Sequence, residues 1–447
     1  MKVKTSISEL NMFDSCKRSW LYSRVSMKRN GSLVFGSAYQ KAIELWGKSF
    51  LAKEALENKE YSDIKEKSRL VKAESITKEK SIEIAQKWLL NPDFEFRTES
   101  NWKLEEYEPK KPNELFHILV DEFMRKNDYE PTEQEINTQI QEMQALLPVM
   151  LHRYFNWFES NNFKWRMIEF SMEWLEKEFY FTIKPDALIE DENGLIWILE
   201  NKTTTKISTD HLEVDPQITS YLTFFEKKTG QNVSGVLWNQ NRKAVEKAPK
   251  ILNNGKLSTD KNQGTSVKLY EQAIIEIYGS LDNAPDNILE TLNHFMVKKD
   301  FLEYEFITKN EFQKENTFNY IKQKTLELNK YKKIFFEDGF EKTFKACCPS
   351  FTRNCKSMCS YYKECTAYEQ NKENIKVNFK VIKKWSDKET GLLNIKIDYY
   401  GKNRFFTAVA TDIKEYIFKD FVSFEKEFIE SVIKGKLKKL LKRELEI

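Results

Sequence analysis

The sequence predicts an α/β fold, a mixed sheet flanked by helices, and three observations support this prediction. The run Leu195 to Leu199 is apolar without polar alternation, which is typical of a strand covered on both faces. Long segments rich in Lys and Glu show helical periodicity before and after it. The 447 residues are 40% apolar and 14% aromatic, enough to build buried cores for about two or three domains.

The net charge and the lack of apolar targeting segments indicate which classes of protein are expected. The chain has 72 basic and 69 acidic residues, a formal charge of +3, so a nucleic-acid surface would have to be a local patch. The N-terminal stretch MKVKTSISEL lacks an apolar signal core, and no apolar stretch approaches the roughly 18 residues that a membrane span needs. We therefore expect a cytoplasmic protein without a membrane partner. The histidines are scattered with no metal-ligand spacing, which favours core or surface roles for them.

The N-terminal part is predicted to be helical. Residues 6 to 25 have aromatic and apolar residues at helical spacing and would form a helix that carries Cys16. The segment FGSAYQKAIELWGKSF is a second predicted helix, with Gln40 and Glu44 one turn apart on one face. Residues 51 to 165 keep the helical periodicity, which indicates a helical insertion.

A β-hairpin is predicted in the middle of the chain. The turn-forming sequence DENG separates two strand-like runs, residues 179 to 189 and 195 to 200. Pairing back from this turn places Asp186 opposite the end of the second strand, where alternation puts Glu200 and Lys202 on one face. Charges at the end of a buried strand are costly to desolvate, so their convergence indicates a functional site.

The segments after the hairpin add further candidates. Asp215 and Pro216 supply a cap and a first-turn proline for a helix that holds Gln217 and Tyr221 on one face. A further strand is predicted over residues 233 to 243, followed by a basic loop and then by helices. Three basic residues follow strand ends near the presumed site and either bind phosphates or belong to the solvated surface: Lys206, Arg242 and Lys243.

The C-terminal part contains a cysteine cluster and a small appendage. All cysteines except Cys16 crowd between positions 347 and 365, which in an intracellular chain favours a metal over disulfides. From about residue 376, alternating sequences and a basic terminal helix predict an α+β unit. The predicted organisation is N-terminal helices of the core at 1–50, the helical insertion at 51–165, the core at 166–346, the cysteine cluster at 347–370 and the appendage at 376–447.

Asp186, Glu200 and Lys202 are the smallest set of side chains that could support metal-assisted cleavage of a phosphodiester. Oxygens of Asp186 and Glu200, with the backbone carbonyl of Asn201, suit Mg²⁺ or Mn²⁺, which would polarise the phosphate and activate water. Lys202 would orient that water and offset the developing charge. In a chain with 32% charged residues, the same pattern also fits a surface hairpin with ion pairs.

Several sequence blocks occur in a characteristic order. They are CKRSWLY around Cys16, FGSAYQKAIELW, KPDALI, LENKTT, DPQITSYL and the late cysteine cluster. Together they resemble the PD-(D/E)XK nucleases of the RecB-like and CRISPR-associated-exonuclease-like group. The stretches GVLWNQNRK and PKILNNGKLS are similar to phage-encoded members in particular. The resemblance covers roughly residues 5 to 370 and leaves the appendage unmatched.

The resemblance implies the PD-(D/E)XK fold and assigns roles within it. It makes Asp186 and Glu200 metal ligands and Lys202 the catalytic lysine. Gln217 and Tyr221 match the glutamine and tyrosine of a helix that lies beside the site and contacts the nucleic-acid backbone. The implied protein is an Mg²⁺- or Mn²⁺-dependent deoxyribonuclease, an exonuclease acting on DNA with a free end. Its expected setting is phage or bacterial recombination, repair or replication, with a recombination or replication protein as partner.

One position departs from the family pattern. Where the family's second helix carries a metal-binding histidine, this sequence has Gln40, whose amide oxygen carries no charge and is the weaker ligand. Glu44, one turn on, or a water would take that place, or the site is degraded. The departure and the unmatched appendage favour, as an alternative, a catalytically weakened protein that binds or scaffolds DNA. An RNA-processing nuclease with the same core is a further alternative.

The cysteines resemble those of a cluster-binding subset of the family, in which one N-terminal and three C-terminal cysteines hold a [4Fe-4S] cluster. The corresponding set here is Cys16, Cys355, Cys359 and Cys365. The first C-terminal spacing has three intervening residues where the family usually has two. Zinc held by the three C-terminal cysteines together with Cys348 is therefore an alternative, as are unligated buried thiols.

Overall fold

The computed structural model describes most of the chain up to residue 409. The described residues are 4–25, 28–60, 62, 64–92, 114–127, 129–176, 179–297, 301–348, 350, 355, 359–362, 365, 379–386, 392–399 and 402–409. No helix in these ranges is long and apolar enough to cross a membrane.

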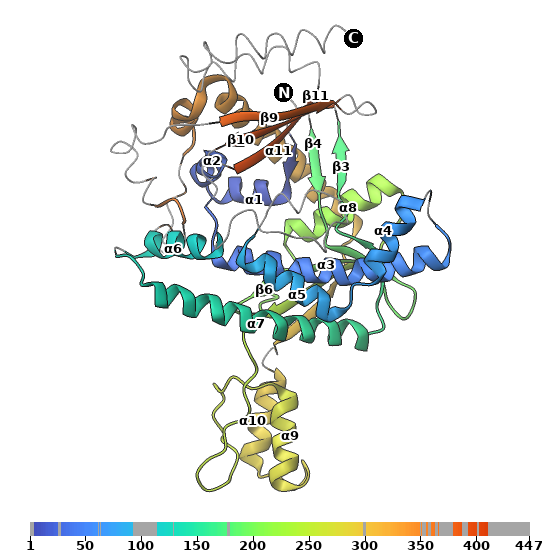
Figure 1. Ribbon diagram of the computed structural model, residues 1–447, viewed down its shortest axis with the longest axis vertical. Coiled ribbons are helices and arrows are strands. Elements are labelled where there is room, and N and C mark those ends of the chain that lie inside the picture. The colour runs from blue at the N-terminus through green and yellow to red at the C-terminus, as the bar shows by residue number, and fades with distance from the viewer. Residues whose placement is uncertain are drawn as a thin grey trace.

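A mixed sheet lies at the centre of the molecule (Figure 1). Among the described residues its strand order is β2-β5-β6-β7-β8. The strands are β2 (Lys164–Ile168), β5 (Ala187–Glu190), β6 (Ile196–Thr204), β7 (Gly235–Arg242) and β8 (Leu302–Ile307). β6 and β7 pair in parallel, whereas the other neighbours pair antiparallel. The predicted α/β class with a mixed sheet is therefore confirmed.

Helices from the first third of the chain cover one face of this sheet. They are α3 (Gly31–Glu57), α4 (Ile64–Glu74), α5 (Lys78–Leu90), α6 (Glu114–Lys126) and α7 (Glu133–Ser160). Buried side chains of α3, α5, α6 and α7 form one core with Leu199 and Leu237 of the sheet. Thr132 and Glu135 form a capping box at the start of α7, which fixes where this long helix begins.

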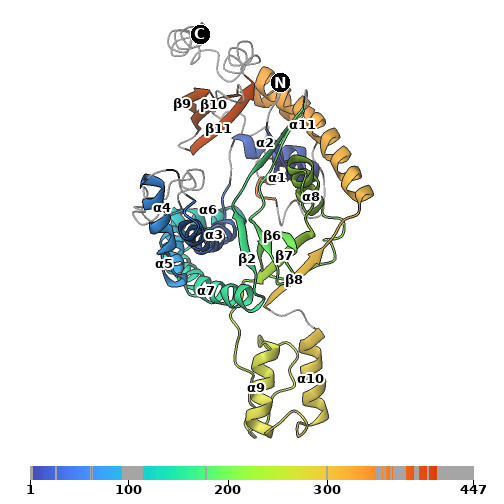
Figure 2. The same ribbon diagram turned by 90° about the vertical axis from the view of Figure 1, so that its right-hand side faces the viewer.

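A second helical layer covers the other face. It consists of α1 (Ile7–Ser15), α2 (Lys17–Val25), α8 (Pro216–Thr229) and α11 (Glu311–Ala346). These helices share a core with Ile198, Val236 and Trp238 of the sheet. Neighbouring residues of β6 thus belong to different cores, as the period-two alternation of a strand requires. Figure 2 shows the sheet between the two layers.

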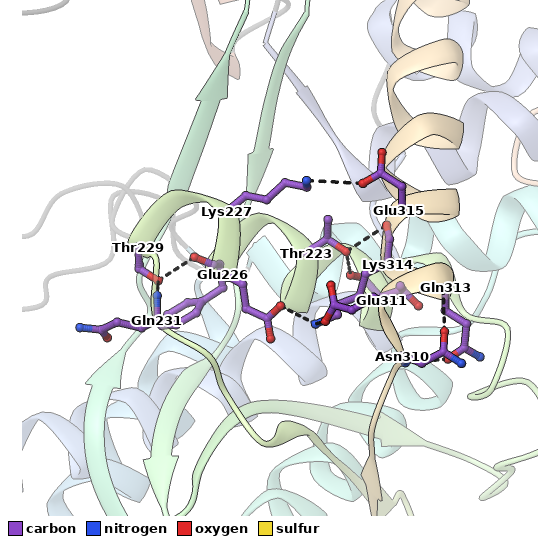
Figure 3. Close-up of polar contacts among 12 residues, drawn as sticks. Thr223, Glu226, Lys227, Thr229, Gln231, Asn310, Glu311, Gln313, Lys314 and Glu315 are labelled. Atoms are coloured by element: carbon purple, nitrogen blue, oxygen red, sulfur yellow. Dashed lines mark hydrogen bonds and ion pairs between the residues drawn. The ribbon is translucent and has the colours of Figure 1, made fainter.

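Contacts with α11 hold α8 in place (Figure 3). Lys314 Nζ lies 2.6 Å from the carboxylate of Glu226, and Lys227 Nζ lies 3.5 Å from that of Glu315. Asn310 and Gln313 form a capping box at the start of α11, which sets the position of these partners along the helix. The helix that carries Gln217 and Tyr221 is therefore anchored at its C-terminal half.

Three smaller units surround this body. One is a sheet of β1 (Thr5–Ser6), β4 (Tyr180–Ile183) and β3 (Met172–Leu175). Another is the antiparallel sheet of β9 (Phe379–Ser386), β10 (Leu392–Tyr399) and β11 (Lys402–Val409), which contains the strand pair predicted for the appendage. The basic terminal helix predicted for the appendage lies outside the described residues. The third unit, α9 (Val267–Tyr278) and α10 (Asp286–Val297), has its own small core and projects from the body (Figure 1).

Several predicted elements differ from the structure. The helix expected over residues 6 to 25 is two helices, because Cys16 between them has an extended backbone with φ of −164°. The strand expected over residues 179 to 189 is divided between two sheets at Lys184 to Asp186, where Pro185 offers no N–H to a ladder. Strands β2, β3 and β8 were not predicted, because short half-exposed strands give only a weak alternating signal.

Candidate active site

One side chain holds the turn of the β5–β6 hairpin. The carboxylate of Asp191 accepts hydrogen bonds from the N–H groups of Asn193 and Leu195 at 2.9 Å and from Trp197 Nε1 at 3.0 Å. Gly194 has a φ of 78°, a left-handed conformation that glycine adopts without a steric penalty. Since a turn of defined geometry sets the pairing of the strands it joins, Asp191 and Gly194 fix the register of the hairpin.

The register places three carboxylates in one row. β5 and β6 pair with Ala187 opposite Leu199, so the next position puts Asp186 opposite Glu200, as predicted. The same antiparallel pairing on the other side of β5 puts Glu169, the residue after β2, opposite Asp186. The row therefore crosses three neighbouring strands at the point where β5 begins.

Asp186 is the middle carboxylate of this row. One of its oxygens accepts a hydrogen bond from the N–H of Asn201 at 2.8 Å, and its carbonyl accepts one from the N–H of Glu169 at 2.7 Å. Burial raises the pKa of Asp186 well above its ordinary value, and the carboxylates of Glu200 and Glu169 raise it further. The Lys202 ammonium acts in the opposite direction. The row thus carries more negative charge than this lysine offsets.

Glu200 is 4% exposed and has one satisfied and one unsatisfied oxygen. Its Oε1 pairs with Lys202 and accepts a hydrogen bond from Gln217 Nε2 at 2.7 Å. Its Oε2 is buried and has no hydrogen-bond partner among the described residues. A buried carboxylate oxygen without a partner is costly, and a bound cation is the ligand that best removes this cost.

Lys202 lies beside the carboxylates and over an aromatic ring. Its Nζ is 5.1 Å from the centroid of the Trp238 ring. Burial alone would lower the pKa of Lys202, but the charges of Glu200 and Asp186 raise it above its ordinary value. The ammonium group therefore stays protonated at neutral pH and remains available as a fixed positive charge.

Helix α8 presents Gln217 and Tyr221 to the same site. Asp215 caps the helix by accepting a hydrogen bond from the N–H of Gln217 at 2.7 Å. Gln217 Nε2 also donates to the Tyr221 hydroxyl at 2.6 Å, and that hydroxyl donates to the carbonyl of Lys184 at 3.3 Å. Burial raises the pKa of Tyr221 well above its ordinary value, and the charge of Glu200 adds to this effect, so the hydroxyl stays protonated.

The side chain of Asn201 belongs to the opposite face of β6. Its Oδ1 accepts a hydrogen bond from Asn239 Nδ2 at 3.0 Å. On the same face, Asn241 Nδ2 donates to the Tyr39 hydroxyl at 3.0 Å and to the carbonyl of Met150 at 2.8 Å. These amides attach the sheet to α3 and α7. Any contribution of Asn201 to metal binding would therefore come from its backbone carbonyl, as expected from the sequence.

Gln40 and Glu44, the candidates on α3, have different surroundings. Gln40 Nε2 donates to Glu169 Oε1 at 3.3 Å and so reaches the row of carboxylates indirectly. Glu44 pairs with Lys41 at 3.1 Å and with Lys48. Burial would raise the pKa of Glu44, but these two ammonium groups bring it below its ordinary value. Glu44 is thus neutralised by neighbours on its own helix.

Glu169 was not predicted as a site residue. Its φ of 48° is left-handed, which is uncommon outside glycine, and its carboxylate is 14% exposed. Its Oε2 lies 2.6 Å from Lys184 Nζ. The available signal was a charged residue directly after the strand-like run KWRMI, the same pattern that identified Glu200. It was missed because β2 itself was not predicted.

The three basic residues at strand ends also differ in their surroundings. Lys206 is exposed. The Arg242 guanidinium lies 5.4 Å from the ring centroid of Phe301, and Lys243 Nζ donates to the carbonyl of Ser32 at 3.3 Å. Burial lowers the pKa of Lys243. Lys243 therefore contributes to the attachment of β7 to α3, and Lys206 is the more accessible cation.

The predicted cysteine set lies together. Burial raises the pKa of the Cys359 thiol, and Cys16, Cys355 and Cys365 are the neighbouring thiols that raise it further. All are free thiols. Cys348, which belongs to the alternative zinc set, is exposed, and Cys348 and Cys16 are both neighbours of the buried Cys347 thiol, whose pKa burial raises.

Packing between the N-terminal helices and α11 brings these cysteines together. The rings of Tyr22 and Tyr361 stack at 5.6 Å, and the Arg18 guanidinium lies 4.1 Å from the ring centroid of Phe344. Arg18 Nη1 also lies 3.7 Å from Cys365 Sγ. Within the described ranges, no group of three or more His, Cys, Asp or Glu side chains has a geometry that would hold a metal ion as it stands. Coordination at either centre would therefore require side-chain adjustment.

Comparison with sequence models of known protein families identifies a superfamily. The sequence model of the PD-(D/E)XK nuclease superfamily matches residues 4–365. No curated protein matches the sequence. The match spans α1 to the last cysteine and includes the whole central sheet and the hairpin, but not the β9–β11 sheet.

Proposed function

Because the chain belongs to the PD-(D/E)XK nuclease superfamily, we propose that it is an Mg²⁺- or Mn²⁺-dependent deoxyribonuclease. In this proposal it removes nucleotides from a free DNA end, in recombination, repair or replication in the cytoplasm of a bacterial or phage-infected cell. Its partners are DNA and a protein of one of these processes.

The arrangement of Asp186 and Glu200 is the observation that carries the proposal. The two carboxylates face each other across the hairpin, and Oε2 of Glu200 is buried without a partner among the described residues. All available donors here are oxygens, which suits a hard divalent cation. The residues therefore fit the metal that the superfamily implies, with the carbonyl of Asn201 as a third donor.

The surrounding side chains supply the rest of the chemistry. A divalent cation bound to Asp186 and Glu200 would polarise the phosphodiester and lower the pKa of an attacking water. The charged Lys202 orients that water and offsets the negative charge that develops on the phosphate. Gln217 donates one N–H to Glu200 and the other to the Tyr221 hydroxyl, so these two side chains hold the Glu200 carboxylate in place beside the scissile phosphate.

We further propose that Cys16, Cys355, Cys359 and Cys365 hold a [4Fe-4S] cluster. The neighbours of the Cys359 thiol support this ligand set, since they are Cys16, Cys355 and Cys365. The cluster would join the N-terminal helices to the end of α11 and stabilise the fold on which the active site is built.

The test is cleavage of matched substrates by the anaerobically purified protein. Linear DNA, covalently closed circular DNA and RNA of the same sequence are each incubated with Mg²⁺, with Mn²⁺ and with EDTA. Metal-dependent loss of the linear DNA alone supports the proposal. Cleavage of the circle would make the enzyme an endonuclease, and cleavage of RNA alone would make it an RNA-processing enzyme. Binding without cleavage in every metal would support the weakened DNA-binding alternative.

A further inference from the structure

Glu169 occupies a position that no assigned role explains. It lies opposite Asp186 in the row of carboxylates, and its N–H donates to the Asp186 carbonyl at 2.7 Å. Its left-handed backbone, with φ of 48°, is a strained conformation for a residue with a side chain. Strain of this kind persists only where the surrounding structure enforces it, and here it sets the direction of a carboxylate beside the site.

The partners of Glu169 connect it to the anomaly on α3. Gln40, which stands where the family has a histidine, donates to Oε1 of Glu169. The exposed Lys184 ammonium lies 2.6 Å from Oε2, so a cation already occupies the second oxygen. Glu200 Oε2 provides the independent sign of a missing ligand, since it is buried and lacks a partner among the described residues.

We infer that Glu169 is a third acidic residue of the cation site and that Gln40 is its positioning residue. This inference rests on the proposed metal-dependent function. Helix α3 then contributes to the site through an amide that orients a carboxylate, instead of through a direct nitrogen ligand. An all-oxygen set of this kind suits Mg²⁺ better than a set with an imidazole does.

Binding of Mn²⁺ alone, measured by calorimetry without nucleic acid, tests this assignment. Glu169→Gln should raise the Mn²⁺ dissociation constant about tenfold, because it removes one charge near the cation. Gln40→Ala should raise it less, and the double variant should match Glu169→Gln, since the two residues act as one unit. Glu190→Gln is the matched control, because Glu190 is the last residue of β5, at the end away from Asp186, and pairs with Arg166.

The outcomes are distinguishable from failure of the proposed function. Wild-type affinity in Glu169→Gln, or additive effects of the two substitutions, would overturn the inference. A wild-type protein that binds Mn²⁺ but cleaves nothing would contradict the proposed function and leave this inference intact. Wild-type Mn²⁺ affinity in the Gln40→Asn variant would contradict a positioning role, because the shorter amide does not reach Glu169.

A second inference comes from the charge distribution of the projecting unit. We call residues 243–261 the basic loop. It contains five lysines and two acidic residues, Glu246 and Asp260, and Glu246 pairs with Arg153 at 3.1 Å. Residues 262–297, which form α9 and α10, contain one lysine and five acidic residues. The basic loop is therefore positively charged and the part with α9 and α10 negatively charged, although the whole chain carries a formal charge of only +3.

The basic loop begins beside the active-site strand. β6 and β7 pair in parallel with Lys202 opposite Gln240, and Lys243 N–H donates to the Thr204 carbonyl at 2.6 Å. The start of the loop is thus roughly 10 Å along the strands from Lys202, at about 3.3 Å per residue. A strand of nucleic acid that leaves the site along β6 would meet this loop.

The loop is held in shape by the core of the projecting unit. Leu257 is 1% exposed in that core and forms a β-bridge with Ile251. The Tyr270 hydroxyl donates to the carbonyl of Ser258 at 2.8 Å, and Lys250 N–H donates to the Gln263 side chain at 2.8 Å. Four lysines of the loop are exposed, and no ion pair to them is found in the part of the chain that the structure describes: Lys247, Lys250, Lys256 and Lys261.

The geometry points to the basic loop as a second contact for the phosphates of the nucleic acid that is cut. The polyanion fits the charge of the loop, whereas the acidic α9 and α10 would repel it from the rest of the unit. The exposed Ile251 of the loop, 58% accessible, would contact bases of an unpaired strand. This inference also rests on the proposed nucleic-acid substrate.

Alanine substitution of the four exposed lysines tests it in the Asp186→Ala background without divalent cations. Binding of a long single-stranded oligonucleotide should weaken, and the slope of log K against log salt should become shallower by up to about 3, at roughly 0.7 per phosphate contact. Binding of an oligonucleotide of about two nucleotides, which spans little more than the distance from Lys202 to the start of the loop, should change much less. The control removes four lysines from helix ion pairs elsewhere: Lys53, Lys87, Lys342 and Lys345.

Equal salt slopes for the loop variant and the control variant would overturn this second inference. If the wild-type protein binds neither oligonucleotide at low salt, the proposed function itself fails. Equal loss of affinity for the long and short oligonucleotides would also contradict the inference, because the loop would then be acting on the active site.

Discussion

The two candidate metal centres of this protein are built in different ways. Asp186 and Glu200 come from adjacent strands, and the register of one hairpin brings them together. Cys16 and Cys365 are separated by most of the chain and meet only because α1 and α2 pack against α11. The first centre forms by the pairing of adjacent strands, and the second forms only when helices from the two ends of the matched region pack together.

This difference determines what each centre needs from its metal. The hairpin is fixed by the Asp191 turn and by sheet hydrogen bonds, so the backbone that carries the carboxylates is held in place before a cation binds and only the side chains have to adjust. The cysteines lie near the end of the well-packed core and close a very long loop, so a cluster would contribute directly to stability. Loss of metal should therefore stop chemistry at the first centre and loosen the fold at the second.

The largest expected effect is on cleavage by variants of the hairpin. Asp186→Asn, Glu200→Gln and Lys202→Ala should each lower the cleavage rate about a thousandfold or more, because each removes a group that acts on the reacting phosphate. Thermal unfolding should stay close to that of the wild type, since the Asp191 turn is untouched.

A control on the other face of the same sheet sharpens this result. Asn241→Ala removes hydrogen bonds to α3 and α7 and should lower the free energy of unfolding by about 1–3 kcal/mol while folded molecules keep cleaving. Wild-type cleavage by Asp186→Asn or Glu200→Gln in a clean preparation would show that the site is elsewhere.

The next largest effect is expected at the cysteine centre. Anaerobically purified protein should be brown and contain iron and labile sulfide, and Cys16→Ala or Cys359→Ala should lose both. The midpoint of thermal unfolding should fall by on the order of 5 °C, because the cross-link between distant segments is lost. Cys348→Ala should change neither property, since this exposed thiol is not part of the proposed ligand set. Stoichiometric zinc without iron in the wild type would favour the zinc alternative.

A smaller effect concerns pH and the metal-free hairpin. The folded-state pKa of Asp186 is raised, so its ionisation destabilises the metal-free protein above the unfolded-state pKa of about 3.9. In EDTA, Asp186→Asn should therefore be more stable than the wild type at pH 8, by on the order of 2 °C, and the difference should shrink as the pH falls toward 4. Saturating Mg²⁺ should reverse the order. A constant difference between pH 4 and pH 8 would contradict the raised pKa.

The sequence predicted the pairing of the hairpin well because its determinants are local. The DENG turn, the alternation of β6 and the cap at Asp215 lie within a short stretch, and the structure has the predicted pairing of Asp186 with Glu200. The proximity of Cys16 to the late cysteines came only from the resemblance to the family. Helix packing over more than three hundred residues leaves no periodic signal in the chain.

Glu169 shows the limit of local signals in physical terms. Its role depends on β2 pairing with β5 and on a left-handed backbone, and neither can be inferred from the propensities of KWRMIEF. The surroundings of Glu44 could not be predicted from local signals either. Glu44 was a ligand candidate because it is one turn from Gln40. The structure surrounds it with Lys41 and Lys48 of its own helix. Helical spacing identifies a shared face, but it does not identify what that face contacts.

The smallest expected effect comes from the substitution that restores the family residue on α3. Gln40→His places a ring nitrogen near the row of carboxylates, and an imidazole N–H can still donate to Glu169 as Gln40 does. The half-saturating Mn²⁺ concentration for cleavage should fall about twofold to threefold, whereas that for Mg²⁺ should change less, since Mg²⁺ prefers oxygen ligands. Glu44→Gln should leave both concentrations unchanged, because Glu44 is already paired with two lysines. A clear loss of metal affinity in Glu44→Gln that Gln40→His suppresses would instead make Glu44 the substitute ligand. In that case the lysine pairs of α3 would have to open when the metal binds.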